Sequence, residues 1–245
     1  MGPLDDRKIL ITGGSSGIGE ATAKAIVAEG GAVALGARRK DKLDEIVEGL
    51  DGTAVAIEAD ISDKEQAKSL VDQANKELGG LDGVVNNAGV MLLGPVLGAE
   101  TDDWKTMLDV NVYGLLLCTH AALPIMKESR GGDIVNVSST AGRIANAGSA
   151  VYNMTKFGVT AFSEALRQEA VEMKVRVTCI EPGFVDTELQ GHNEGEVEEM
   201  IEKMRGQIGK VLEADDIANA IVYALSQPEH VLVNEVLVRP SGQVR

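Results

Sequence analysis

Strand-like and helix-like segments alternate along the whole chain, and this alternation restricts the possible folds more than any other feature. Short apolar or β-branched runs are separated by longer stretches with helical periodicity or a helix-capping residue. The expected strands are residues 8–12, 32–37, 53–58, 83–86, 133–138, 175–180 and 231–238. The expected helices are residues 18–29, 41–50, 63–78 with Asp63 as N-cap, 101–129 with Thr101 as N-cap, 149–172 and 215–226. Such a chain predicts an α/β fold, in which a doubly wound parallel sheet of about seven strands carries helices on both faces.

The chain has the length of one α/β domain, and its composition shows no boundary. We therefore predict a single domain over residues 1–245. One segment, 188–210, differs from the rest because it is rich in Glu, Met and Gly. It follows the carboxyl end of a strand, where ligands bind in such folds, and we interpret it as a substrate lid. A helical surface insertion is the alternative.

Charge and apolar content argue against several classes of function. The net charge of −15 disfavours binding to nucleic acid, whose phosphates would repel the protein. No uninterrupted apolar run reaches the roughly 18–20 residues that span a membrane, and residues 1–8 lack the apolar core of a signal peptide. The two cysteines and three histidines are scattered, so no metal site is expected. A soluble, cytoplasmic protein is the expectation.

A glycine-rich turn, TGGSSGIG over residues 12–19, follows the first strand and opens the first helix. Gly13 permits the tight turn, Gly17 lets the backbone approach a pyrophosphate, and Gly19 allows close packing of the helix on the sheet. Free N–H groups and the helix dipole attract phosphates to this point. The turn therefore indicates a dinucleotide site in a Rossmann-type domain.

The end of the second strand selects between the two nicotinamide cofactors. An acidic residue there would bind the ribose 2′-hydroxyl and repel a 2′-phosphate, but the sequence has Ala37 followed by Arg38 and Arg39. Guanidinium groups bind phosphate well, and two cations that merely began a helix would oppose its dipole. We therefore expect NADPH rather than NADH.

Two further strand ends extend the cofactor site. Asp60 follows the third strand, where its carboxylate can accept a hydrogen bond from the adenine amino group. The sequence NNAG, residues 86–89, ends the fourth strand. Its small residues leave room for the cofactor, and its amides can tie neighbouring strands together.

Tyr152 and Lys156 are four residues apart on an expected helix and so share one face. A free phenol titrates near pH 10, and a neighbouring ammonium would lower its pKa toward the working range. Many helices carry such a pair by chance, so its meaning depends on its neighbours. Ser139 ends the fifth strand and Asn111 lies on the long helix beside it, which places all four side chains at one crevice.

The ordered motifs TGxxxGIG, NNAG, NVxG, SS, YxxxK and PGxxxT resemble those of the short-chain dehydrogenase/reductase family over essentially the whole chain. The resemblance implies that Asn111, Ser139, Tyr152 and Lys156 form a catalytic tetrad, and that the residues around Arg38 belong to the NADP-preferring branch. It further implies that Asn111 positions a water linked to Lys156. The implied NADP(H)-binding residues are Gly13, Ser15, Ser16, Gly17, Ile18, Gly19, Arg38, Arg39, Asp60, Ile61, Asn87, Ala88, Gly89, Tyr152, Lys156, Pro182, Gly183, Val185 and Thr187.

The activity that this resemblance implies is NADPH-dependent interconversion of a ketone or aldehyde and an alcohol. The alternatives are a family enzyme of another reaction type and a non-catalytic NADPH-binding regulatory or scaffold protein. The C-terminal half is similar to clavulanate dehydrogenase-type and 3-hydroxy acid dehydrogenase-type reductases, through residues 180–183, 186–192 and 238–240. One departure is that Ser15 and Ser16 stand where many members have a basic residue, so phosphate recognition would rest on their hydroxyls together with the two arginines.

The substrate side is less defined than the cofactor side. The candidate substrate residues are Ser139, Tyr152, Met91, Leu92, Arg143, Phe184 and His192. Arg143 would suit a carboxylate, as in a 3-oxo acid, but a surface ion pair explains it equally well. The resemblance also implies a homotetramer or homodimer, with the long helices at the interface. The apolar stretch 115–122 fits that role, although the core of a monomer would bury it too.

Overall fold

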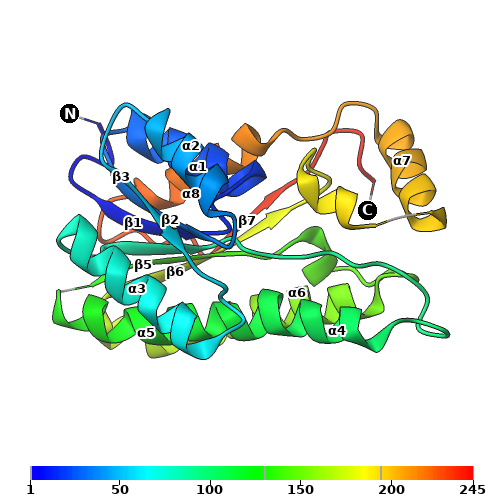
Figure 1. Ribbon diagram of the computed structural model, residues 1–245, viewed down its shortest axis with the longest axis horizontal. Helices are drawn as coiled ribbons and strands as arrows, with labels where there is room; N and C mark the ends of the chain where they lie inside the picture. Colours follow the sequence, from blue (N-terminus) through cyan, green and yellow to red (C-terminus); the bar gives the residue numbers. More distant parts are fainter. Residues whose placement is uncertain (1, 130, 194, 245) are drawn as a thin grey trace.

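The computed structural model describes residues 2–129, 131–193 and 195–244. Its described strands form one seven-stranded parallel sheet in the order β3-β2-β1-β4-β5-β6-β7, which confirms the predicted fold class (Figure 1). The strands are β1 (Lys8–Thr12), β2 (Ala32–Ala37), β3 (Ala54–Glu58), β4 (Gly83–Asn86), β5 (Gly132–Val137), β6 (Val175–Pro182) and β7 (Glu235–Val238).

Helices cover both faces of the sheet (Figure 1). One face carries α1, α2 and α8, whose apolar residues form one buried cluster with the strands, and the other carries α3, α5 and α6 over a second cluster. The helices are α1 (Gly17–Ala28), α2 (Lys40–Glu48), α3 (Lys64–Leu78), α4 (Thr101–Leu108), α5 (Leu115–Glu128), α6 (Ala150–Glu169), α7 (Glu196–Ile208) and α8 (Ala214–Leu225). The short helical turns are η1 (Asp109–Gly114), η2 (Thr140–Gly142), η3 (Val171–Met173) and η4 (Glu188–His192).

The order of the strands determines where a ligand can bind. From β1 the chain moves outward to β2 and β3, and then returns to place β4 on the other side of β1. Because every strand pair is parallel, all carboxyl ends lie at one edge of the sheet. The reversal therefore opens a crevice outside the carboxyl ends of β1 and β4.

The long helix departs from the prediction in two ways. It begins at Thr101 rather than after it, with Glu100 as an N-cap that makes no side-chain capping bond. It is also interrupted by the π-helical turn η1 between α4 and α5. Such turns insert an extra residue and are frequent at functional sites. This one contains Asn111.

The last strand is shorter than predicted, because residues 231–234 bond to side chains as well as to backbone. The Val231 carbonyl accepts a hydrogen bond from Arg176, and the Val233 carbonyl accepts one from Thr178. The ladder to β6 therefore holds only Glu235–Val238.

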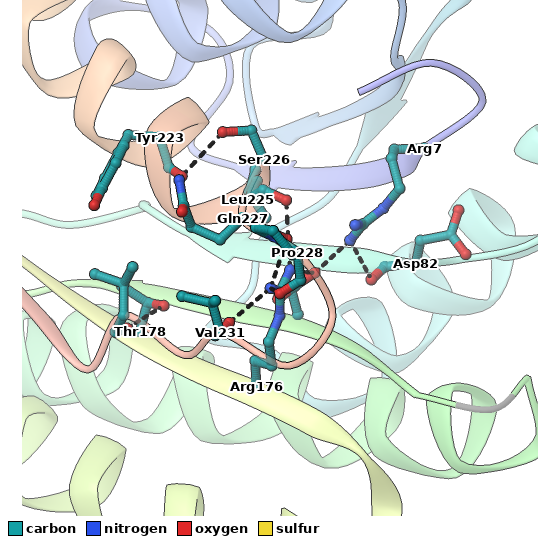
Figure 2. A network of polar contacts seen from close by, with 12 residues as sticks. Arg7, Asp82, Arg176, Thr178, Tyr223, Leu225, Ser226, Gln227, Pro228 and Val231 are labelled. Atoms are coloured by element: carbon teal, nitrogen blue, oxygen red, sulfur yellow. Dashed lines mark hydrogen bonds and ion pairs between the residues drawn. The ribbon is translucent and has the colours of Figure 1, made fainter. Parts of the chain in front are cut away.

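The amino edge of the sheet is closed by a network of ions and carbonyls. Asp133, at the start of β5, is buried and accepts hydrogen bonds from both Arg7 and Arg176. Figure 2 shows Arg176 surrounded by carbonyls after α8, and it donates to those of Gln227 and Pro228. Arg7 also reaches the carbonyl of Asp82 (Figure 2).

The helical segment from Thr101 to Glu128 is long and apolar enough to cross a membrane, by length and composition alone. Core helices of soluble proteins pass the same test. Here α5 buries Leu115, Cys118, Ala122 and Met126 in the protein interior. Of the most apolar window of this segment, 33% is buried, so packing within the monomer accounts for part of its apolar content.

Candidate active site

The glycine-rich turn after β1 is shaped by two backbone conformations that favour glycine. Gly13 has φ +66° and Gly17 has φ +54°. A Cβ at Gly13 would lie 2.7 Å from the Cα of Ala88, and one at Gly17 would lie 3.2 Å from Cγ2 of Thr187. The turn is thus approached from the ends of both β4 and β6. A Cβ at Gly19 would collide with the Gly13 carbonyl, which agrees with the packing role predicted for Gly19.

A crevice of about 340 Å³ runs along this carboxyl edge. It brings together the glycine-rich turn, the ends of β2, β3, β4 and β6, and the catalytic candidates of β5 and α6. The predicted residues that line it are Gly13, Ser15, Ser16, Gly17, Ile18, Arg38, Arg39, Asp60, Ile61, Asn87, Ala88, Gly89, Ser139, Tyr152, Lys156, Pro182, Gly183, Val185, Thr187 and His192. The other predicted site residues are not among the described residues that line this crevice: Gly19, Met91, Leu92, Asn111, Arg143 and Phe184.

Arg39 lies across the glycine-rich turn. Its Nη2 donates to Ser15 Oγ at 3.0 Å and to Ser16 Oγ at 2.9 Å. The same nitrogen forms an ion pair of 2.9 Å with Glu188, the first residue of η4. Sequence reasoning identified the arginines and serines but missed Glu188, because no local pattern places it opposite β2.

The ends of β1 and β4 are tied together by side chains. Thr12 Oγ1 accepts from the backbone N–H groups of Asn87 and Ala88, each at 3.1 Å. Asn87 Nδ2 donates to the carbonyls of Thr12 and Gly13. These bonds confirm the strand-tying role of the amide and hold the turn open beside β4.

Asp60 lies in the crevice after β3, but its carboxylate is partly used locally. Its Oδ1 accepts from the Ser62 backbone N–H at 3.0 Å and from Ser62 Oγ at 2.7 Å. Contact with an adenine amino group remains a prediction.

Tyr152 and Lys156 project from one face of α6 into the crevice, and both are buried. Lys156 Nζ lies 5.8 Å from the centre of the Tyr152 ring and donates to the Val137 carbonyl at 3.0 Å. Ser139, at the end of β5, hydrogen-bonds Tyr152. The three side chains therefore meet as predicted.

The expected lowering of the tyrosine pKa is wrong for this structure. Burial raises the pKa of Tyr152 to about 12, against which the hydrogen bond from Ser139 works. Burial also lowers the pKa of Lys156 to about 8. The physical reason is that both charged forms lose water here, and the Lys156 ammonium is directed at a carbonyl rather than at the phenol.

Asn111 is buried in the π-helical turn and organises the floor of the crevice. Its Oδ1 accepts from the Val90 N–H at 2.7 Å, and its Nδ2 donates to the Val90 carbonyl at 2.8 Å. A Cβ on Gly89 would lie 3.3 Å from Asn111 Oδ1 and 3.8 Å from Lys156 Nζ. Asn111 is therefore close to Lys156, but its side chain binds the backbone of Val90 and does not face the open crevice.

Of the candidate substrate residues outside the catalytic group, one lines the crevice and the others do not. His192 lines the crevice, and burial together with the nearby Arg38 lowers its pKa. Arg143 forms ion pairs with the buried Glu181 and with Glu235, so the ion-pair interpretation is the one observed. Phe184 lies after β6, and its N–H donates to Gln243.

Asn193 was not recognised from the sequence. Its buried side chain accepts from the Leu93 N–H at 2.8 Å and donates to the Met91 carbonyl at 3.0 Å. It connects the end of η4 to the segment after β4, so the predicted lid region is fastened beside the crevice. That region, 188–210, includes Glu194, which lies outside the described residues.

The crevice fits a dinucleotide. Two glycines form a cradle that a Cβ would fill, at the start of α1, and the arginines lie at the end of β2. Among the described residues, no group of three His, Cys, Asp or Glu side chains gathers to hold a metal ion. Fold and site together define a dinucleotide-binding α/β oxidoreductase.

The comparisons with known proteins give the family. The family model described as short chain dehydrogenase matches residues 7–198. An uncharacterised oxidoreductase of Staphylococcus saprophyticus is 37% identical over 99% of both chains. The chain therefore belongs to the short-chain dehydrogenase/reductase family.

Other relatives carry more specific names. Glycine betaine reductase of Emericella nidulans is 40% identical over 99% of this chain, which spans only 19% of that protein. The closed form of serine dehydrogenase with NADP+ has a TM-score of 0.90 at 33% identity, covering 97% of this chain and 96% of that one. A 3-ketoacyl-(acyl-carrier-protein) reductase of Brucella melitensis with NADH has a TM-score of 0.88 at 28% identity, covering 97% and 98%. Serine is a 3-hydroxy acid, so the second of these agrees with the resemblance to 3-hydroxy acid dehydrogenases.

Proposed function

We propose that this protein is an NADPH-dependent oxidoreductase that interconverts a ketone or aldehyde and an alcohol. The observation that carries the proposal is that Tyr152, Ser139 and Lys156 share one crevice with the glycine-rich turn and the arginine pair. A non-catalytic NADPH-binding protein would have no need of this arrangement. The alternative of another reaction type is disfavoured by the same three side chains.

Each catalytic side chain has a role that follows from its position. When bound, the nicotinamide supplies or takes a hydride at the carbonyl carbon. Ser139 and Tyr152 donate hydrogen bonds to the carbonyl oxygen, and Tyr152 gives it a proton during reduction. Lys156 offsets the negative charge left on the phenolate. Asn111 fixes the backbone at Val90 and thereby keeps the floor of the crevice in place.

The raised pKa of Tyr152 fixes its protonation state, although an acid with a pKa nearer the working pH gives up its proton more readily. With a pKa of about 12, the phenol keeps its proton throughout the neutral range and can donate it. Carbonyl reduction is the direction that this protonation state favours. The reverse reaction requires the phenolate, which the charge of Lys156 would have to stabilise.

The preference for NADPH is supported by Ala37, Arg38 and Arg39 at the end of β2. A reversed charge at this point tests it. We expect Arg38→Asp to raise the Michaelis constant for NADPH by tenfold or more while changing that for NADH much less, because only NADPH carries the 2′-phosphate. Equal effects on both cofactors would remove the support for NADPH.

The substrate class is best approached with a panel of compounds. The relatives act on a hydroxy amino acid, a 3-ketoacyl group and glycine betaine, according to their names. We infer a small polar carbonyl or alcohol of the 3-hydroxy acid type. Following NADPH absorbance tests this, with NADPH supplied to 3-oxo acids, diketones and aldehydes and NADP+ supplied to secondary alcohols. If no carbonyl consumes NADPH and no alcohol forms it, the non-catalytic alternative is favoured.

We also propose that the protein is a cytoplasmic homodimer or homotetramer. Leu115, Cys118 and Ala122 are buried inside the monomer, so the stretch 115–122 does not itself argue for an interface. Other apolar side chains on these helices are exposed. They are Leu108, Tyr113, Met154 and Phe157. Light scattering distinguishes a monomer from the expected dimer or tetramer.

A further inference from the structure

The first residue of η4 reaches the arginine that the cofactor site needs. Glu188 pairs with Arg39 Nη2 at 2.9 Å, and it also hydrogen-bonds Ser16 in the glycine-rich turn. Arg39 and Ser16 are two of the residues that the sequence predicts to bind the 2′-phosphate. A carboxylate and a phosphate are both anions that bind a guanidinium and a hydroxyl, so they are chemically equivalent occupants of this place.

The position of Glu188 is set by its own segment. Thr187 Oγ1 accepts from the Leu189 N–H at 3.4 Å, and the backbone N–H of Thr187 donates to Gln190 Oε1 at 3.3 Å as part of the capping box at the start of η4. Gln190 in turn donates to the Val185 carbonyl at 2.7 Å. At the other end of η4, Asn193 is buried against Met91 and Leu93. Because both ends are held, Glu188 faces the glycine-rich turn as part of a fixed segment.

We propose that Glu188 is a specificity-determining residue for the dinucleotide. The free protein holds Arg39 in an internal ion pair, which the 2′-phosphate of NADPH must displace and which NADH leaves intact. Glu188 therefore weakens the binding of NADPH selectively and narrows the preference that the arginines create. The inference rests on the proposed function, because it takes the arginine pair as the 2′-phosphate site.

The test is a set of dissociation constants for NADPH, NADH and 2′-AMP, measured by calorimetry on the full chain. We expect Glu188→Gln to tighten NADPH and 2′-AMP about three- to tenfold, because an exposed ion pair and a like-charge repulsion are both removed. NADH should change less than twofold. Glu199→Gln, the same change at an exposed position on α7, serves as the matched control and should leave all three constants unchanged.

A double-mutant cycle identifies the partner. In an Arg39→Gln background, Glu188→Gln should tighten NADPH by a smaller factor than in the wild type, because the ion pair is already gone and only the repulsion between the carboxylate and the 2′-phosphate is left to remove. An unchanged dissociation constant for NADPH in Glu188→Gln overturns the inference. An equal loss of affinity for NADPH and NADH also overturns it, because Glu188 would then only hold η4 in place. A wild-type protein that binds NADH more tightly than NADPH would instead overturn the proposed cofactor. In that case the role of Glu188 is still tested by the NADPH dissociation constant of Glu188→Gln divided by that of the wild type.

Discussion

The two edges of the parallel sheet treat charge in opposite ways. At the amino edge, the buried Asp133 lies between Arg7 and Arg176, so its charge is matched within the protein. At the carboxyl edge, Lys156 and Tyr152 are buried with pKa values moved away from their ordinary ranges by loss of water. The comparison teaches that one edge uses charge for stability, whereas the other keeps the charge of Lys156 at a cost in stability for use in chemistry.

The largest effect is expected from removing a single oxygen at the carboxyl edge. Tyr152→Phe should lower kcat by about 10²–10⁴-fold, because the proton donor is lost. The affinity for NADPH should stay near that of the wild type, since the ring remains in place. Steady-state reduction rates and calorimetric binding measure the two quantities. A variant that retains most of its rate would show that another group is the acid.

A substitution at the amino edge should lower stability and leave the activity of the folded protein unchanged. Asp133→Ala leaves two arginines facing each other without their carboxylate, and we expect it to lower the free energy of unfolding by about 3–5 kcal/mol. The rate per folded molecule should not change. Urea denaturation measures this effect. Asp72→Ala breaks only the exposed pair with Lys68 and should cost less than about 1 kcal/mol, and equal losses in both variants would contradict the role given to Asp133.

Removing the charge at Lys156 should stabilise the protein while stopping catalysis. Its pKa falls from 10.5 to about 8 on folding, so at pH 7 the folded state pays for keeping the proton. Allowing for the lost hydrogen bond to Val137, we expect Lys156→Met to gain about 2 kcal/mol at pH 7. The unfolded chain binds more protons than the folded one between about pH 8 and 10.5, so wild-type stability rises with pH there. The advantage of the variant should therefore shrink across that range, and denaturation at pH 7 and pH 10 measures it.

Much of the carboxyl edge could be predicted from the sequence because its residues lie next to local signals. Gly13 and Gly17 follow a strand and open a helix, and Tyr152 and Lys156 share a helical face. The meeting of these residues at one edge could be inferred as well, since a parallel sheet brings all carboxyl ends together. The π-helical turn at Asn111 had no such signal, because the segment reads as ordinary helix.

What the sequence could not provide are contacts between distant segments. Glu188 meets Arg39, and Asn193 meets Leu93, across long separations in the chain and without a shared motif. The same limit applied to Arg143, whose two acidic partners come from β6 and β7. The pKa of Tyr152 was mispredicted for a related reason, because spacing shows that a lysine is near but not which way its ammonium points.

The smallest expected effect is a pH dependence that separates Lys156 from Tyr152. The pKa of Lys156, lowered to about 8 by burial, means that the side chain is charged below pH 8 and neutral above it. A neutral lysine no longer offsets the phenolate that proton donation leaves at Tyr152. We therefore expect kcat/KM for reduction of a non-ionising ketone to fall by about tenfold between pH 8 and pH 9.

Tyr152 itself cannot cause that fall, because its pKa of about 12 keeps it protonated across the same range. Lys156→Arg provides the control, since a guanidinium stays charged up to pH 10 and beyond. We expect its rate to be lower because the side chain has a different shape, but its profile should be flat between pH 7 and pH 10. A flat wild-type profile, or the same fall in Lys156→Arg, would mean that the charge at this position does not support the proton donor. The charge of Lys156 at the carboxyl edge would then have no catalytic use to set against the stabilising role of Asp133 at the amino edge.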